Sequence, residues 1–155
     1  MFTLADICDI AIQIEENGEA TYRQAAKNTG HKALAAMLNS MADDEHQHAA
    51  WFRKLDRDQD VVLAEQDELE KMGRSLLREM VKDQTFSLDA EQLANTGTIK
   101  ALLDQSLLFE KDTIVFYEML QSFIDHTHVR DQLERIIEQE NEHIHQITAM
   151  RTTQF

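Results

Sequence analysis

The sequence predicts an all-α fold, an antiparallel four-helix bundle made of two helix hairpins. Three observations support it. The 155 residues include no proline and only 4 glycines, so little interrupts a helix. Apolar residues recur at alternating spacings of four and three, which keeps them on one helical face. The chain also repeats one helical pattern at a shift of 95 residues. With 43% hydrophobic residues, we expect a single domain over 1–155.

Each predicted hairpin joins two long helices through a short break. The first has helices over 3–28 and 32–55, separated at Asn28 to Gly30, where a glycine follows the helix end. The second has helices over 98–124 and 129–150, separated at Asp125 to Thr127. Such short breaks predict antiparallel neighbours, so the hairpins span 3–55 and 98–150.

The connection over 56–97 is expected to cross the length of the bundle. Helices 32–55 and 98–124 must run parallel in a simple bundle, which requires a long crossover. Residues 61–82 read as an amphipathic helix within it. Its apolar side carries Leu69, Met72, Leu76, Leu77 and Met80.

The repeat brings uncommon residues into coincidence. The stretch from Ile14 to Tyr22 matches that from Phe109 to Tyr117. The chain has 2 tyrosines, and the shift superposes them. The matched pairs are Glu15 with Glu110, Tyr22 with Tyr117, Glu45 with Glu140, and His48 with His143.

The same shift decides between overlapping Asp/Glu-x-x-His pairs. Asp43 and His46 form a competing pair, but the position equivalent to His46 is Asn141. Glu142 and His145 also have the spacing, yet neither has an equivalent in the first half. Only the pairs repeated in both halves are therefore predicted to point inward.

Each predicted helix carries a core stripe, a set of seven residues on one face. The stripes are Leu4, Cys8, Ala11, Glu15, Gly18, Tyr22, Ala25; Leu34, Leu38, Met41, Glu45, His48, Phe52, Leu55; Ile99, Leu103, Ser106, Glu110, Thr113, Tyr117, Leu120; and Val129, Leu133, Ile136, Glu140, His143, Ile147, Met150. Every stripe is apolar or small except near its middle, where it carries a glutamate and, on two helices, a histidine three residues later.

Four carboxylates and two imidazoles are thus predicted at one level of the core. Burying a bare carboxylate costs several kcal/mol, and neighbouring acids repel one another. A hydrogen-bonded network of neutral acids is one solution. Two divalent cations are another, since their charge balances four glutamates and they take oxygen and nitrogen ligands. One glutamate from each of two helices, plus Glu-x-x-His from each of the others, is the arrangement of di-iron carboxylate bundles. The candidate metal ligands are Glu15, Glu45, His48, Glu110, Glu140 and His143.

Other residues of the stripes suggest how the site is completed. Ala11, Gly18, Ser106 and Thr113 flank the glutamates and leave room for a small ligand on the metals. Tyr22 and Tyr117 lie two turns from the glutamates on the same faces. They are either hydrogen-bond donors to the ligand carboxylates or ordinary core aromatics.

The segments "AIQIEENGEATYRQAA…MADDEHQHAAWFRKL" and "LLFEKDTIVFYEML…IIEQENEHIHQI" resemble the rubrerythrin branch of the ferritin-like superfamily. The resemblance covers the four long helices. It implies a non-haem centre of two iron ions, bridged by Glu45 and Glu140 or by oxide, for which zinc or manganese are substitutes. It also implies reaction with hydrogen peroxide or dioxygen and a homodimer.

Two departures from that family bear on activity. Rubrerythrins carry a further glutamate one turn after the ligand of the third bundle helix, where this chain has Thr113. Glu19, one turn after Glu15, is a candidate extra carboxylate but lies off the core stripe. Cys8 is the only cysteine, so the Cys-x-x-Cys pairs of a rubredoxin domain are missing. Turnover is therefore expected to need an external electron donor, rubredoxin-like or a flavoprotein.

Charge and composition narrow the remaining classes. A formal net charge of −14 and a pI near 4.8 argue against nucleic acid and anionic membrane surfaces as partners. We expect a cytoplasmic protein, because no secretory or membrane-spanning pattern occurs. The histidines outside the core stripes are expected at the surface: His31, His46, His126, His128 and His145.

Three functions stay open at this point. The first is a redox enzyme that reduces peroxide or dioxygen at an iron pair. The second is a ferroxidase or an iron-binding and storage protein, in which iron itself is the substrate. The third is a non-catalytic bundle with a structural metal pair.

Overall fold

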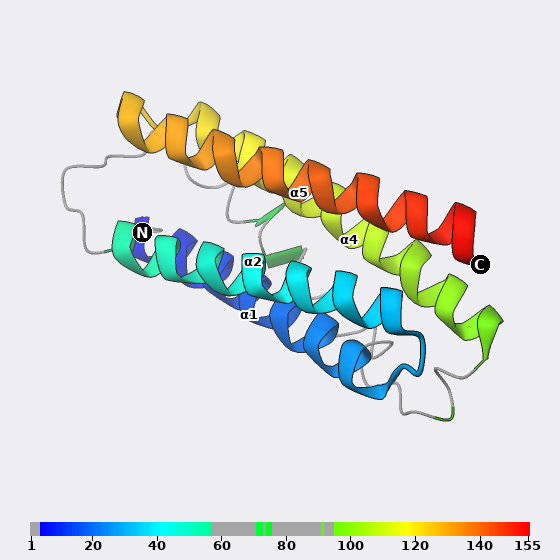
Figure 1. Ribbon diagram of the computed structural model, residues 1–155. Coiled ribbons are helices and arrows are strands. Elements are labelled where there is room, and N and C mark those ends of the chain that lie inside the picture. The colour runs from blue at the N-terminus through cyan, green and yellow to red at the C-terminus, as the bar shows by residue number, and fades with distance from the viewer. Residues whose placement is uncertain (1–3, 57–70, 73, 76–90, 92–94) are drawn as a thin grey trace.

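Four long helices form two antiparallel hairpins in a computed structural model that describes residues 4–56, 71–72, 74–75, 91 and 95–155. The helices are α1 (Leu4–Asn28), α2 (Lys32–Asp56), α4 (Thr96–Ser122) and α5 (Thr127–Gln154). In Figure 1, α1 and α2 form one layer of the bundle, and α4 and α5 form the other. This arrangement confirms the predicted four-helix bundle.

The helices of the second hairpin begin two residues earlier than predicted, because side chains cap them. The Asn95 side chain accepts hydrogen bonds from the backbone N–H groups of Gly97 and Thr98, at 2.8 and 3.3 Å. The ring of His126 accepts from the N–H of Val129 in the same way. Each cap satisfies amide groups that have no partner inside the helix.

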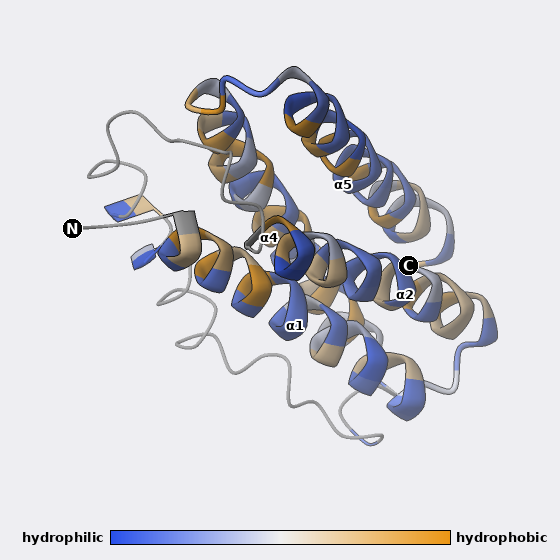
Figure 2. Cartoon of the chain, turned by 90° about the vertical axis from the view of Figure 1, so that its left-hand side faces the viewer, coloured by the Kyte–Doolittle hydropathy of each residue, from blue (hydrophilic) through white to orange (hydrophobic). Residues whose placement is uncertain are grey.

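The predicted core stripes form the interior of the bundle. All stripe residues with described side chains are buried, except Met150 near the end of α5, which is half-buried. Figure 2 shows the result by hydropathy: the outer side of α5 is mainly hydrophilic, whereas α1 and α4 carry hydrophobic segments between hydrophilic ones. A period of alternating four and three residues was therefore enough to identify the buried face.

Two hydrophobic clusters lie at opposite ends of this interior. One contains Phe52, Tyr117 and Leu133 among its members. The other contains Tyr22 and Leu38. On α1, α2 and α5 the glutamate of the core stripe stands between the residues of the first cluster and those of the second. On α4 the same order holds except for Phe109, a member of the first cluster that directly precedes Glu110. The polar level is thus enclosed by apolar packing along the bundle axis.

The crossover between the layers starts after Asp56 and ends before Thr96. Most of the helix predicted over 61–82 lies outside the described residues, although 71–72 and 74–75 are helical. Met72, one of its predicted apolar residues, packs against the cluster that contains Phe52. Within the described part of the chain, every helix is too short or too polar to span a membrane.

Truncation of Leu38 tests the packing of this interior. Leu38 is fully buried, so Leu38→Ala should lower the free energy of unfolding by about 2–5 kcal/mol, through lost burial and a residual cavity. Leu108 on α4 is 60% exposed, and Leu108→Ala is the matched control, with an expected change within about 0.5 kcal/mol. Urea denaturation of both variants would measure the difference; equal losses would contradict the assigned core.

Candidate metal centre

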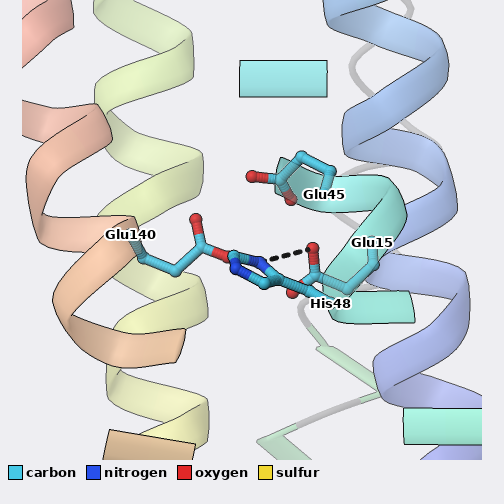
Figure 3. A group of neighbouring side chains, drawn as sticks. All are labelled: Glu15, Glu45, His48 and Glu140. Atoms are coloured by element: carbon cyan, nitrogen blue, oxygen red, sulfur yellow. Dashed lines mark hydrogen bonds and ion pairs between the residues drawn. The ribbon is translucent and has the colours of Figure 1, made fainter. Parts of the chain in front are cut away.

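Six buried side chains from all four helices meet at one level of the bundle. They are Glu15 on α1, Glu45 and His48 on α2, Glu110 on α4, and Glu140 and His143 on α5. Each is at most 3% exposed. Figure 3 shows Glu140 reaching from α5 towards Glu15, Glu45 and His48 of the other layer. The residues predicted from the repeat are therefore brought together.

The six residues divide into two groups with the geometry of cation sites. Glu15, Glu45, His48 and Glu140 form one group, and Glu45, Glu110, Glu140 and His143 form the other. Within each group the candidate ligand atoms all lie within 4.8 Å of one another. Glu45 and Glu140 belong to both groups, which is the position that a bridging carboxylate requires.

The inner nitrogen of each imidazole faces these carboxylates. His48 Nδ1 donates to Glu140 Oε1 at 3.0 Å and lies 3.5 Å from Glu15 Oε2. His143 Nδ1 lies 3.1 Å from both Glu45 Oε1 and Glu140 Oε2. Both rings therefore present Nδ1 to the centre.

The two tyrosines join the layers by hydrogen bonds to the outer glutamates, Glu15 and Glu110, each of which belongs to only one of the two groups. Tyr22 of α1 donates to Glu110 Oε1 of α4 at 2.6 Å, and Tyr117 of α4 donates to Glu15 Oε1 of α1 at 2.5 Å. Each phenol occupies one oxygen of its carboxylate and leaves Oε2 without a hydrogen bond from any residue that the structure describes. The tyrosines thus orient these glutamates from the opposite helix.

Two residues at the edge of the centre were missed by the sequence analysis. Asp44 Oδ2 accepts a hydrogen bond from Nε2 of His143 at 2.9 Å. Gln139 Oε1 accepts one from Nε2 of His48 at 2.6 Å. The sequence contains a signal for both residues, because Asp44 and Gln139 are equivalent in the repeat and each directly precedes a shared glutamate.

Burial and mutual repulsion shift the pKa values of the carboxyl groups apart. Burial raises the pKa of Glu15, and the charge of Glu140 raises it further. The same two causes raise the pKa values of Glu45 and Glu110 well above the usual range. Burial also acts to raise the pKa of Glu140, but the adjacent rings of His143 and His48 hold it well below the usual range. Glu140 is therefore the carboxylate that ionises most readily.

The imidazoles are held in their charged form by the carboxylates. Burial alone would lower the pKa of His48, but the close carboxylates of Glu140 and Glu15 raise it to about 11. Burial likewise opposes the charged form of His143, and Glu110 and Glu140 raise its pKa to about 11. Protons thus take the place that other cations would take in neutralising the buried acids.

The donor atoms of the centre fit a pair of metal ions. In the part of the chain that the structure describes, both carboxylate oxygens of Glu45 and one oxygen each of Glu15, Glu110 and Glu140 are buried without a hydrogen-bond partner. His143 Nδ1 is also without one. Buried polar atoms normally find partners, and a set of them directed at one volume fits the binding of cations there. Oxygen and imidazole donors in this ratio suit iron, manganese or zinc.

Gly18 allows the shared glutamate Glu45 to approach the backbone of α1 closely. A Cβ atom at this position would come within 3.0 Å of Glu45 Oε2 and 3.4 Å of the Phe109 ring. The equivalent residue in the second half is Thr113, whose buried hydroxyl has no hydrogen-bond partner among the described residues. Glu45 therefore packs closely against α1 at a position where any larger side chain would displace its carboxylate.

Other candidate residues lie away from the centre. Glu19 contacts His46 at 2.9 Å near the surface and belongs to neither group of candidate ligands. His126, His128 and His145 are exposed, as predicted, along with His46. His31 differs, because it is half-buried: its ring accepts from the N–H of Leu34 and lies against Phe155.

Comparison with known proteins places the chain in a family. The model of the family described as Rubrerythrin matches residues 6–151. The chain belongs to the rubrerythrin family. The structure of this rubrerythrin family member is also similar to a crystal structure from Thermotoga maritima, of a protein assigned as ferritin-like diiron-carboxylate. The TM-score is 0.70 and the identity 23%, over 99% of this chain and 97% of that chain, so this likeness supports the fold. Among curated proteins, none matches the sequence significantly.

Metal uptake by this rubrerythrin should release protons. A cation that binds Nδ1 must displace the proton from each imidazole, and both pKa values are about 11. We expect Zn²⁺ binding at pH 7 to release roughly two or more protons per chain, and the Zn²⁺ affinity to rise between about pH 6 and 9 as protons compete less. Calorimetry in buffers of different ionisation enthalpy measures the release. Uptake without proton release would show that the imidazoles are neutral beforehand.

Proposed function

We propose that the chain is a di-iron protein that reduces hydrogen peroxide or dioxygen with electrons from an external donor. The observation that carries this proposal is the pair of four-residue groups that share Glu45 and Glu140. Membership of the rubrerythrin family and the likeness to a ferritin-like diiron-carboxylate fold support iron as the metal.

The proposed ligand set assigns a role to each of the six residues. Glu15 and Glu110 would each hold one ion through the oxygen that its tyrosine leaves free. Glu45 and Glu140 would bridge both ions, and the two imidazoles would each bind one ion through Nδ1. Four glutamate charges then balance two divalent cations, which removes the repulsion that raises the carboxyl pKa values.

The chemistry needs electrons and a protected site. A bound pair of ferrous ions would supply the two electrons that, with two protons, convert hydrogen peroxide into two molecules of water. Apolar clusters on both sides along the bundle keep bulk water from the centre. The absence of a side chain at Gly18 lets the Glu45 carboxylate lie close to the backbone of α1. The Tyr22 and Tyr117 hydroxyls hold the outer carboxylates in place during any change in charge.

A single experiment distinguishes this function from the two alternatives. The protein is loaded anaerobically with Fe²⁺ and mixed with peroxide or with dioxygen in separate stopped-flow runs, with a chemical reductant added afterwards. Rapid oxidation that repeats after each reduction, with iron retained, is the result we expect. Iron uptake far beyond two ions per chain, or release after oxidation, would instead indicate a ferroxidase or storage protein. A centre that retains metal but does not oxidise would indicate a structural metal pair.

Removing a bridging glutamate tests the ligand assignment. Glu45→Ala and Glu140→Ala should each abolish retention of two Fe²⁺ ions per chain, because each glutamate serves both groups. Asp43→Ala and Glu138→Ala are matched controls: both side chains are exposed, and each lies two residues before a bridging glutamate. Elemental analysis after desalting under anaerobic conditions gives the count. Two ions retained by either glutamate variant would contradict the bridging role.

The remaining partners stay predictions. An external electron donor follows from the single cysteine of the sequence, and a homodimer follows from the family resemblance. Steady-state peroxide consumption with a rubredoxin or a flavoprotein reductase would identify the donor class.

A further inference from the structure

Each imidazole of the centre has an outer partner, the residue that accepts a hydrogen bond from Nε2, and the two outer partners differ in charge. His143 Nε2 donates to the carboxylate of Asp44 at 2.9 Å. His48 Nε2 donates to the amide oxygen of Gln139 at 2.6 Å. Asp44 and Gln139 occupy equivalent positions in the repeat, so the two halves of the chain differ here by one negative charge.

The phenolic hydrogen bonds of the centre are matched between the halves. Glu15 and Glu110 each accept one phenolic hydrogen bond, at 2.5 and 2.6 Å. Glu19 is a second acid without an acidic equivalent, but its carboxylate contacts the exposed His46 and none of the six residues. The acid and the amide behind the rings therefore differ in charge and hydrogen-bond directly to candidate ligands. Gly18 and Thr113 are another unequal pair beside the centre, but they carry no charge.

A carboxylate behind a histidine strengthens its binding to metal. Both outer partners accept from Nε2–H and so leave Nδ1 to face the centre. Only the carboxylate adds a negative charge that makes the ring a stronger donor, and losing such a partner typically lowers metal affinity about 10–100-fold. The anion also favours a proton on Nδ1, but a dication carries twice the charge and gains more from the same interaction.

We propose that Asp44 makes the two cation positions of the centre unequal, so that the position served by His143 binds a divalent cation more tightly and fills first. The position served by His48, with Gln139 behind it, binds more weakly and fills second. This inference rests on the metal pair of the proposed function and adds to it an order of filling.

Cobalt(II) is the probe for this test, because it binds the same kinds of site as iron(II) and stays divalent during the titration. Anaerobic titration with Co²⁺, followed by calorimetry and visible absorption, should resolve a tighter and a weaker step in the unaltered protein. Asp44→Asn keeps the size of the side chain and removes its charge. It should weaken the tighter step about 10–100-fold and change the weaker step much less.

Two further variants make the result specific. Gln139→Glu adds the charge behind His48 and should strengthen the weaker step while the tighter step stays close to its original value. Asp43→Asn is the matched control, because it removes one charge from an exposed neighbour that pairs with Arg23 rather than with a ring of the centre. Both steps should keep their affinities in that variant. Repulsion between two bound ions also makes the second step weaker, but it acts in every variant. The loss of affinity expected in Asp44→Asn and the gain expected in Gln139→Glu therefore separate the effect of the outer charge from this repulsion.

Two results would overturn the inference. One is an unchanged tighter step in Asp44→Asn together with an unchanged weaker step in Gln139→Glu. The other is equal weakening of both steps in Asp44→Asn. The proposed function can fail without this inference failing. If iron-loaded protein does not turn over with peroxide while the Co²⁺ steps respond as expected, the proposed function is wrong and the order of filling still holds.

Discussion

Compensation of buried charge is the constraint on which this structure depends. Four glutamates and two histidines, each at most 3% exposed, lie between two hydrophobic clusters. Their charges cannot be relieved by water, so they shift one another's protonation and leave several oxygens without a partner. The same repulsion that would destabilise an apolar bundle becomes binding energy when cations enter. Stability and metal chemistry are thus linked in one set of residues.

The repeat explains how the fold builds a centre with two equivalent sides. Each hairpin contributes one glutamate alone and one Glu-x-x-His pair. The tyrosines of α1 and α4 each donate a hydrogen bond to the single glutamate of the other layer. Neither hairpin contains a complete group, because Glu140 of α5 is needed beside His48 and Glu45 of α2 is needed beside His143. Association of the layers and assembly of the centre are therefore the same event. Gly18 opposite Thr113 and Asp44 opposite Gln139 then make the two sides different.

The fold and the six central residues were predictable from the sequence because both depend on periodicity within single helices. The alternating spacing identified the buried face, and the repeat chose Glu45 and His48 over Asp43 and His46. The hydrogen bonds of Asp44 and Gln139 were not predicted, since they cross between α2 and α5 and depend on how the helices are rotated against each other. The start of α5 was also misplaced, because a histidine cap at His126 is less characteristic than Ser, Thr, Asp or Asn.

The most direct test of the central claim is the number of divalent cations that the folded chain retains. Native mass spectrometry of protein loaded anaerobically with Fe²⁺ and then desalted counts the bound ions, and thermal unfolding of the same sample measures their effect. Compensation of the buried carboxylates predicts two ions per chain and a higher unfolding temperature than that of the chelator-treated protein. Protein that retains no ions, and unfolds at the same temperature with and without Fe²⁺, would show that protons alone neutralise the six residues and would contradict the account.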